Sequence, residues 1–171
     1  YFKRKAIFSD EDDQLFSDND ERAIFFAKGV VETVKKLNWA PDIIHVHGWM
    51  ASLLPLYIKE YYSDEPLFSE SKIITSVYNK DFEGELNSDL AEKIKFDKIS
   101  DDKIQVLKEP NYTNIIKSAV SNSDAIVQGS QEIPEEISEE IEKTDIPALA
   151  YQEEDSFESY LNFYQELISE E

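Results

Sequence analysis

Residues 39–49, WAPDIIHVHGW, decide the fold of this 171-residue chain. The apolar run from Ile43 to Val46 follows Pro41 and leads into Gly48, and both flanking residues are typical of turns. A short apolar run between turn residues is typical of a strand buried in a parallel sheet. The stretch therefore predicts a buried strand of an α/β domain, followed at once by a loop.

Helices and further strands are expected on both sides of this strand. Upstream, Ser17 or Asp18 can cap a helix with an acidic first turn, and the spacing of its apolar residues carries it to about Leu37. Downstream, the sequence predicts strands over 72–78, 125–128 and 146–151. It also predicts a helix over 50–62 that is kinked or begins late at Pro55, and short surface helices over 87–107. Further helices are predicted over 112–120 and 133–141, and the chain closes with a helix whose apolar stripe is Phe157, Leu161, Tyr164 and Ile168.

This alternation of strands and helices requires crossover connections, which favours an α/β fold with a parallel sheet flanked by helices. We expect one such domain over residues 1–171, because the length and the hydrophobic fraction of 41% suit a single folded core. Ligands of such sheets bind beyond the carboxyl ends of the strands. Residues 48–50 and 79–84 fall there and form the candidate crevice loops.

The chain carries 37 acidic and 17 basic residues, and its formal net charge is -20. This field repels phosphate backbones and anionic lipid surfaces, so we expect neither nucleic acid nor a membrane as a partner. No cysteine is present, which excludes disulfides and thiolate chemistry and fits a reducing, cytoplasmic location. The glutamates within residues 135–142 are interpreted as a solvated helix face and not as a catalytic pair.

Residues 39–49 closely resemble the W-x-P-D-x-x-H-x-H-D-W run of bacterial glycogen synthases and plant starch synthases. Four further segments match the same family in order. Residues 1–4 (YFKR) resemble Tyr-Phe-Asp-Arg, and residues 18–22 (DNDER) followed by AIFF resemble D-N-x-x-R-F-A. Residues 76–84 (SVYNKDFEG) resemble T-x-H-N-x-x-Y-Q-G, and residues 115–130 (IIKSAVSNSDAIVQGS) resemble F-L-K-A-G-x-x-x-A-D-x-x-x-x-V-S. The resemblance extends from Tyr1 to about Ile137.

The resemblance implies half of a GT-B glycosyltransferase. Members of the family have two Rossmann-like domains facing a cleft, and they transfer glucose from ADP-glucose or UDP-glucose to the end of an α-1,4-glucan with retention of configuration. The likeness is to the first, acceptor-side domain. The K-x-G-G-L loop that cradles the donor and the second domain have no counterpart among these 171 residues, so a nucleotide sugar is expected only if a second domain is supplied.

Two substitutions fall within the matched motifs. Gly48 stands where the family has an aspartate beside the reacting sugar, and Tyr78 stands where it has a histidine that binds the transferred glucose. Glycosyl transfer develops charge at the sugar and at the leaving phosphate, so loss of a carboxylate and an imidazole weakens the electrostatic complementarity. We therefore expect no transfer by this chain alone, and we assign it no catalytic residue, no metal and no cofactor.

The alternative to a divergent transferase is a non-catalytic glucan-binding or regulatory module that kept the fold, which we favour for this chain as given. In either case we expect a crevice that binds an α-1,4-glucan weakly, with Trp49 and Tyr78 stacking on sugar rings. The residues expected to line this crevice are Asp18, Asn19, His47, Gly48, Trp49, Tyr78 and Asn79.

Several of these residues have simpler interpretations. His45 and His47 are the only histidines. We expect them to point to opposite faces of the sheet and not to share a metal, with His45 satisfied by backbone groups and His47 equally suited to the crevice or to packing. Trp39 is interpreted as a core aromatic, while Trp49 could equally pack the next helix. Asp18 and Arg22 could be only a helix cap and an ion pair, and Ser130 a second cap.

Overall fold

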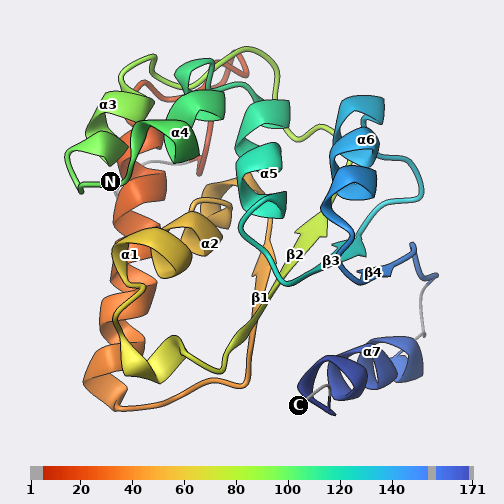
Figure 1. Ribbon diagram of the computed structural model, residues 1–171. Helices are drawn as coiled ribbons and strands as arrows, with labels where there is room; N and C mark the ends of the chain where they lie inside the picture. Colours follow the sequence, from red (N-terminus) through yellow and green to blue (C-terminus); the bar gives the residue numbers. More distant parts are fainter. Residues whose placement is uncertain (1–5, 154–156, 170–171) are drawn as a thin grey trace.

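The structure, a computed structural model, describes residues 6–153 and 157–169 (Figure 1). The match at residues 1–4 lies outside the described residues. Four parallel strands form one sheet in the order β1-β2-β3-β4, which confirms the α/β class. The strands are β1 (Ile43–His47), β2 (Lys72–Val77), β3 (Ala125–Gln128) and β4 (Ala148–Leu149).

The register aligns the carboxyl ends of the first three strands. His47 lies opposite Ser76 in β2, and Val77 lies opposite Gln128 in β3. β4 is shorter than the predicted span of 146–151, because Pro147 has no N–H to donate and only its carbonyl accepts, from Ile126 N at 2.9 Å. β1 stands at the other edge of the sheet, and no strand within the described ranges pairs with its outer side.

Helix α1 (Asn19–Leu37) precedes β1 and ends where Asn38 adopts a left-handed conformation. After β1 the chain forms a 3-10 turn, η1 (Trp49–Ala51), a short α2 (Leu54–Leu56) and a π-helical turn, η2 (Tyr57–Tyr61). Of the two alternatives predicted at Pro55, a kink or a late start, the structure shows the late start, because α2 begins at Leu54 with Pro55 in its first turn. The remaining helical segments are η3 (Pro66–Phe68), α3 (Leu90–Lys95), α4 (Asp101–Ile104), η4 (Gln105–Lys108), α5 (Tyr112–Val120), α6 (Glu135–Thr144) and α7 (Phe157–Ser169).

Most helices cover one face of the sheet, and α7 covers the other (Figure 1). Val46, Ile73, Val77 and Ile126 contribute to the larger core with α1, α2 and α5. On the opposite face, Phe163 and Leu167 of α7 pack with Ile74, Ala125 and Val127. The sheet is therefore enclosed on both faces, as parallel sheets generally are.

The predicted apolar stripe of the closing helix is wrong in part. Phe157 is 76% exposed and Leu161 and Ile168 are also exposed, whereas Phe163 and Leu167 are buried. The helix carries apolar residues around most of its circumference, so more than one stripe fits the helical period. Tyr164, a member of the predicted stripe, does lie partly buried against the sheet.

The charged segment over 87–107 is anchored more firmly than a surface helix would be. Leu90, Ile94, Ile99, Ile104 and Leu107 are buried, whereas Phe96 is 88% exposed. Lys93 of α3 also reaches the first turn of α1, where its Nζ lies 2.6 Å from Asp20 Oδ2 and 2.9 Å from Glu21 Oε1. The acidic first turn therefore binds α3 besides facing the positive end of its own helix.

Two predictions about caps are corrected. Asp18 is the N-cap residue of α1, but its side chain makes no capping hydrogen bond. Ser130 caps no helix, because α6 begins at Glu135 with Pro134 as its N-cap. The Ser130 hydroxyl instead accepts a hydrogen bond from the Asn79 backbone N–H at 3.1 Å, which joins the ends of β2 and β3.

Candidate functional site

Four of the seven expected site residues meet at the carboxyl ends of β1 and β2, namely His47, Gly48, Tyr78 and Asn79. The pair that joins the two strand ends is His47 and Tyr78, with Nδ1 and the phenolic oxygen 2.8 Å apart. His47 is exposed, and Tyr78 is half-buried. This edge of the sheet is where parallel α/β folds hold their ligands.

Gly48 makes the turn from β1 into η1. Its φ is 73° and its ψ is 157°, a backbone conformation that is essentially confined to glycine. Its carbonyl accepts hydrogen bonds from Ala51 N at 3.2 Å and from Ser52 Oγ at 3.1 Å. A Cβ built at this position would meet no atom within 4 Å, so the constraint on residue 48 comes from the backbone alone.

The ring of Tyr78 lies in the space where Gly129 has no side chain. A Cβ at Gly129 would come within 2.5 Å of Tyr78 Cε1 and 2.8 Å of Cδ1. The backbone on both sides of this contact is fixed, because Gly129 N donates to Val77 O at 2.7 Å and Tyr112 Oη donates to Tyr78 O at 3.0 Å. Tyr78 is thus held by its ring, its hydroxyl and its carbonyl.

The two histidines point to the same face of the sheet, so the expectation of opposite faces is wrong. Side chains two positions apart on a strand share a face. The ring centroids of His45 and His47 are 4.1 Å apart. Within the described part of the chain, no three His, Asp or Glu side chains come together as possible metal ligands.

His45 is satisfied by side chains and not by backbone groups, which corrects a second expectation. Its Nδ1 lies 2.6 Å from the Tyr164 hydroxyl of α7, and its Nε2 lies 2.8 Å from Ser76 Oγ of β2. Burial, together with the neighbouring His47, lowers the pKa of His45 to about 4. Burial also lowers the pKa of His47 and raises that of Tyr164, so all three rings are uncharged at neutral pH.

Asn19, a residue expected to line the crevice, is buried at the start of α1. Its Nδ2 donates to Phe8 O at 2.7 Å, and its Oδ1 accepts from Arg22 at 2.7 Å. Arg22 also donates to Ile7 O at 2.5 Å. The matched segment at residues 18–22 therefore fixes residues 7 and 8 against α1, and the Asn19 amide has both of its polar atoms engaged.

Trp49 is a packing residue in this structure. It is 3% exposed, and its ring lies 5.1 Å from Phe8 and 5.1 Å from Phe82, measured between centroids. A ring enclosed in this way presents no face to a sugar, contrary to our expectation. Of the two expected stacking residues, Tyr78 alone is accessible.

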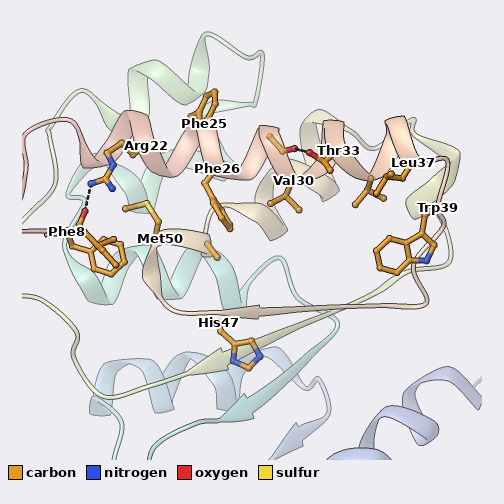
Figure 2. Close-up of a pocket in the computed structure, with 14 residues that line it drawn as sticks. Phe8, Arg22, Phe25, Phe26, Val30, Thr33, Leu37, Trp39, His47 and Met50 are labelled. Atoms are coloured by element: carbon orange, nitrogen blue, oxygen red, sulfur yellow. Dashed lines mark hydrogen bonds between the residues drawn. The ribbon is translucent and has the colours of Figure 1, made fainter. Parts of the chain in front are cut away.

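Trp39 is 58% exposed, so its interpretation as a core residue is wrong. It lies at one end of a groove of about 790 Å³ that runs between α1 and the outer edge of β1. Figure 2 shows Phe26 and Val30 of α1 pointing into this groove, with His47 below them on the strand. Most lining side chains are apolar, and His47 is one of the few polar groups that reach it.

Three residues of the site were not expected from the sequence. Ser76 and Tyr164 hold His45, and Gly129 accommodates Tyr78. Gly129 alone had a possible signal, because it stands where the family motif has valine, and the nearby motif has Tyr78 in place of histidine. At position 129 glycine replaces the larger valine, and at position 78 tyrosine replaces the smaller histidine. The structure shows that these two positions are in contact.

Comparison with known proteins identifies the family of the chain. Residues 1–149 match the family model described as the starch synthase catalytic domain, which extends the matched region past Ile137. The chain is 35% identical over 140 residues to glycogen synthase of Chlorobium luteolum and 33% identical over 138 residues to that of Chlorobium limicola. Each alignment covers 80% of this chain and 28% of the relative.

A more distant relative is glycogen synthase of Clostridium perfringens, with 29% identity over 140 residues, 80% of this chain and 27% of the relative. The chain therefore spans little more than a quarter of the length of these relatives. No solved structure shows significant similarity to it. The ordered motifs, the parallel sheet and the match over residues 1–149 together establish that the chain belongs to the starch synthase catalytic domain family.

Proposed function

We propose that this chain forms the acceptor side of an α-1,4-glucan-binding crevice of the glycogen and starch synthase type, and that alone it transfers no glucose. The observation that carries the proposal is the meeting of His47, Tyr78 and Asn79 at the carboxyl ends of β1 and β2. Family membership supports the choice of ligand class, because the curated relatives are glycogen synthases.

The proposed binding mode combines one ring face with a few polar groups. Tyr78 offers a ring that is held in place, while His47 and the Asn79 side chain are exposed beside it. Stacking of a sugar on an aromatic ring needs only the apolar face of the sugar, so it survives loss of the family's aspartate and histidine. Half a cleft buries little of a ligand, and we expect a Kd on the order of 1 mM, about -4 kcal/mol.

Catalysis is not expected, because the groups that would stabilise the transition state are missing. Gly48 has no side chain at the position of the family's carboxylate, and the Tyr78 hydroxyl is already hydrogen-bonded to His47. Neither group can offset the positive charge that develops on the sugar. The acidic field of the chain also disfavours a nucleotide sugar unless basic groups are supplied from elsewhere.

A glucosyltransferase that acts through residues outside these 171 is the second candidate. It is favoured by one observation: the glycogen synthases that match are far longer than the aligned region. In that arrangement, a donor domain would bind ADP-glucose or UDP-glucose and face the edge of the sheet at His47.

Cytoplasmic location remains a prediction supported by the absence of cysteine. None of the helices in the described ranges has the length and hydropathy to span a bilayer.

The binding test is a titration of the isotope-labelled chain with maltoheptaose. Amides near Gly48 and Asn79 should shift, whereas amides of α6 around Glu139 should not. Tyr78→Ala should abolish the shifts, and Glu139→Ala is the matched surface control that should preserve them. Absence of amide shifts at about 10 mM maltoheptaose would contradict the glucan proposal, because a Kd near 1 mM predicts near-saturation at that concentration.

Transfer is measured separately as incorporation of labelled glucose from ADP-glucose or UDP-glucose into glycogen. We expect no incorporation above a heat-inactivated control. Incorporation by the chain alone would show that Gly48 and Tyr78 do not prevent the reaction, and would overturn the non-catalytic interpretation.

A further inference from the structure

His47 has one ring nitrogen bound and one available. Nδ1 lies 2.8 Å from the Tyr78 hydroxyl, while Nε2 forms no hydrogen bond within the described residues. The residue is exposed and borders the groove along β1. The state of Nε2, donor or acceptor, therefore decides what His47 can offer to a ligand.

The Tyr78 hydroxyl sets that state. A phenol O–H is more acidic than the N–H of a neutral imidazole, and an imidazole nitrogen is more basic than a phenol oxygen. Tyr78 therefore donates to Nδ1, and the single ring proton of neutral His47 resides on Nε2. The same reasoning assigns the Tyr164 hydroxyl as donor to His45 Nδ1, 2.6 Å away, and leaves the ring proton on Nε2, 2.8 Å from Ser76 Oγ.

The geometry depends on Gly129. The Tyr78 ring occupies the position that any side chain at residue 129 would need, since a Cβ there would lie 2.5 to 2.9 Å from three ring carbons. With Val77 O bound to Gly129 N at 2.7 Å, the strands cannot separate to relieve the overlap. A larger residue 129 would therefore displace the ring and carry the hydroxyl away from His47.

We propose that Tyr78 is a positioning residue, seated on Gly129, whose hydroxyl fixes His47 as the Nε2–H tautomer and so makes it a hydrogen-bond donor to a ligand oxygen such as a sugar hydroxyl. The ring of His45, held at both of its nitrogens, packs against His47 with the two ring centroids 4.1 Å apart. The choice of a sugar as ligand rests on the proposed function, whereas the tautomer does not.

Long-range proton–nitrogen NMR spectra of the 15N-labelled 171-residue chain test the tautomer without any ligand. We expect His47 to carry its proton on Nε2. Tyr78→Phe keeps the ring beside Gly129 and removes only the hydroxyl. The protein should therefore fold, while His47 becomes a mixture of tautomers. Tyr164→Phe is the matched control, because it removes the equivalent hydroxyl at His45 and should leave His47 unchanged.

Gly129→Ala tests whether the position of the Tyr78 ring depends on the space beside Gly129. Residue 129 does not have a positive φ, so alanine is compatible with the backbone, and the expected effect is displacement of the Tyr78 ring. His47 should then respond as it does in Tyr78→Phe, although the hydroxyl is still present. A proton on Nδ1 in the unmodified chain, or an unchanged His47 in Tyr78→Phe, would overturn the inference.

Maltoheptaose separates this inference from the proposed function. If both hold, the shift of the His47 ring signals on adding maltoheptaose should fall at least several-fold in Tyr78→Phe. If the tautomer responds as expected but the sugar shifts no resonance, the positioning role stands and the glucan proposal fails. Equal sugar-induced shifts in Tyr78→Phe and the unmodified chain would show that the hydroxyl does not position His47 for the ligand, and would overturn the inference.

Discussion

Replacing Gly48 by alanine separates backbone strain from steric overlap. The φ of 73° and ψ of 157° lie in a region that residues with a Cβ occupy only at a cost of about 1–3 kcal/mol. The Cβ itself would meet nothing within 4 Å, so no packing clash contributes to this cost. For a protein of this size, each kcal/mol lowers Tm by about 2–4 °C, which gives a decrease of about 2–12 °C.

The matched control is Gly29→Ala. Gly29 lies inside α1, has no positive φ and also has open space around its Cβ position. Alanine is favoured over glycine in a helix, so this variant should gain about 0.5–1 kcal/mol. Urea unfolding followed by circular dichroism measures both changes. An unfolding midpoint for Gly48→Ala equal to or above that of the unmodified chain would refute the strained turn.

The same strain applies to Gly48→Asp, which would restore the family's carboxylate. We expect this variant to lose about 1–3 kcal/mol of stability, as alanine does, because the backbone and not the side chain sets the cost. Recovering the carboxylate thus requires a change of the turn as well as of the residue. A Gly48→Asp protein as stable as the unmodified chain would show that the turn relaxes freely.

Three further predictions concern charge and packing. The pKa of His45 is about 4 in the folded chain against 6.5 in the unfolded chain, so the unfolded chain takes up the proton first as the pH falls. The free energy of unfolding should therefore decrease by on the order of 2–3 kcal/mol between about pH 6.5 and about pH 4. Urea titrations should show that His45→Gln flattens this pH dependence. Leu167→Ala should cost about 2–4 kcal/mol and release α7 to proteolysis, whereas Leu161→Ala, at an exposed position, should change stability by less than about 0.5 kcal/mol. Finally, a gel shift with single- or double-stranded nucleic acid at micromolar protein and physiological salt should be absent, given the charge of -20.

The elements that local sequence determines were predicted closely. α5 and β3 have the predicted bounds, and Asn111 supports the start of α5 by accepting a hydrogen bond from Asn114 N at 2.9 Å. The late start of α2 was predicted from Pro55, because proline is tolerated in the first turn of a helix and not in its interior. Helix caps and prolines act within a few residues of the chain, so their effects can be predicted without knowing which elements pack nearby.

The wrong predictions concern residues whose burial depends on how the helices pack against the sheet. Trp39 would be a core residue if the outer side of β1 were covered, and it is exposed because the groove there is open. The buried side of α7 depends on its docking against Ile74 and Val127, which its own periodicity does not reveal. The shared face of His45 and His47, in contrast, follows from the sequence itself, because residues two apart on a strand lie on the same side of the sheet.

The sequence placed His47 and Tyr78 at the ends of β1 and β2, where they do lie, but it did not reveal their contacts with each other and with Gly129. The proximity of Tyr78 and Gly129 depends on the register of β2 against β3, in which Val77 lies opposite Gln128. A single sequence shows both departures from the family motif without showing that they touch. The contact between Tyr164 and His45 spans 119 positions and depends on the docking of α7.

Within the described ranges the outer edge of β1 is unpaired, and this edge makes the colloidal behaviour of the chain dependent on its charge. Two molecules that met along these edges could continue one sheet into the other, with Trp39 and Phe26 at the junction. Each brings a charge of -20, so mutual repulsion opposes the encounter over a Debye length of about 10 Å at 0.1 M salt and only about 3 Å at 1 M. Self-association along this edge should therefore strengthen as salt is added, opposite to the behaviour of a dimer held by ion pairs.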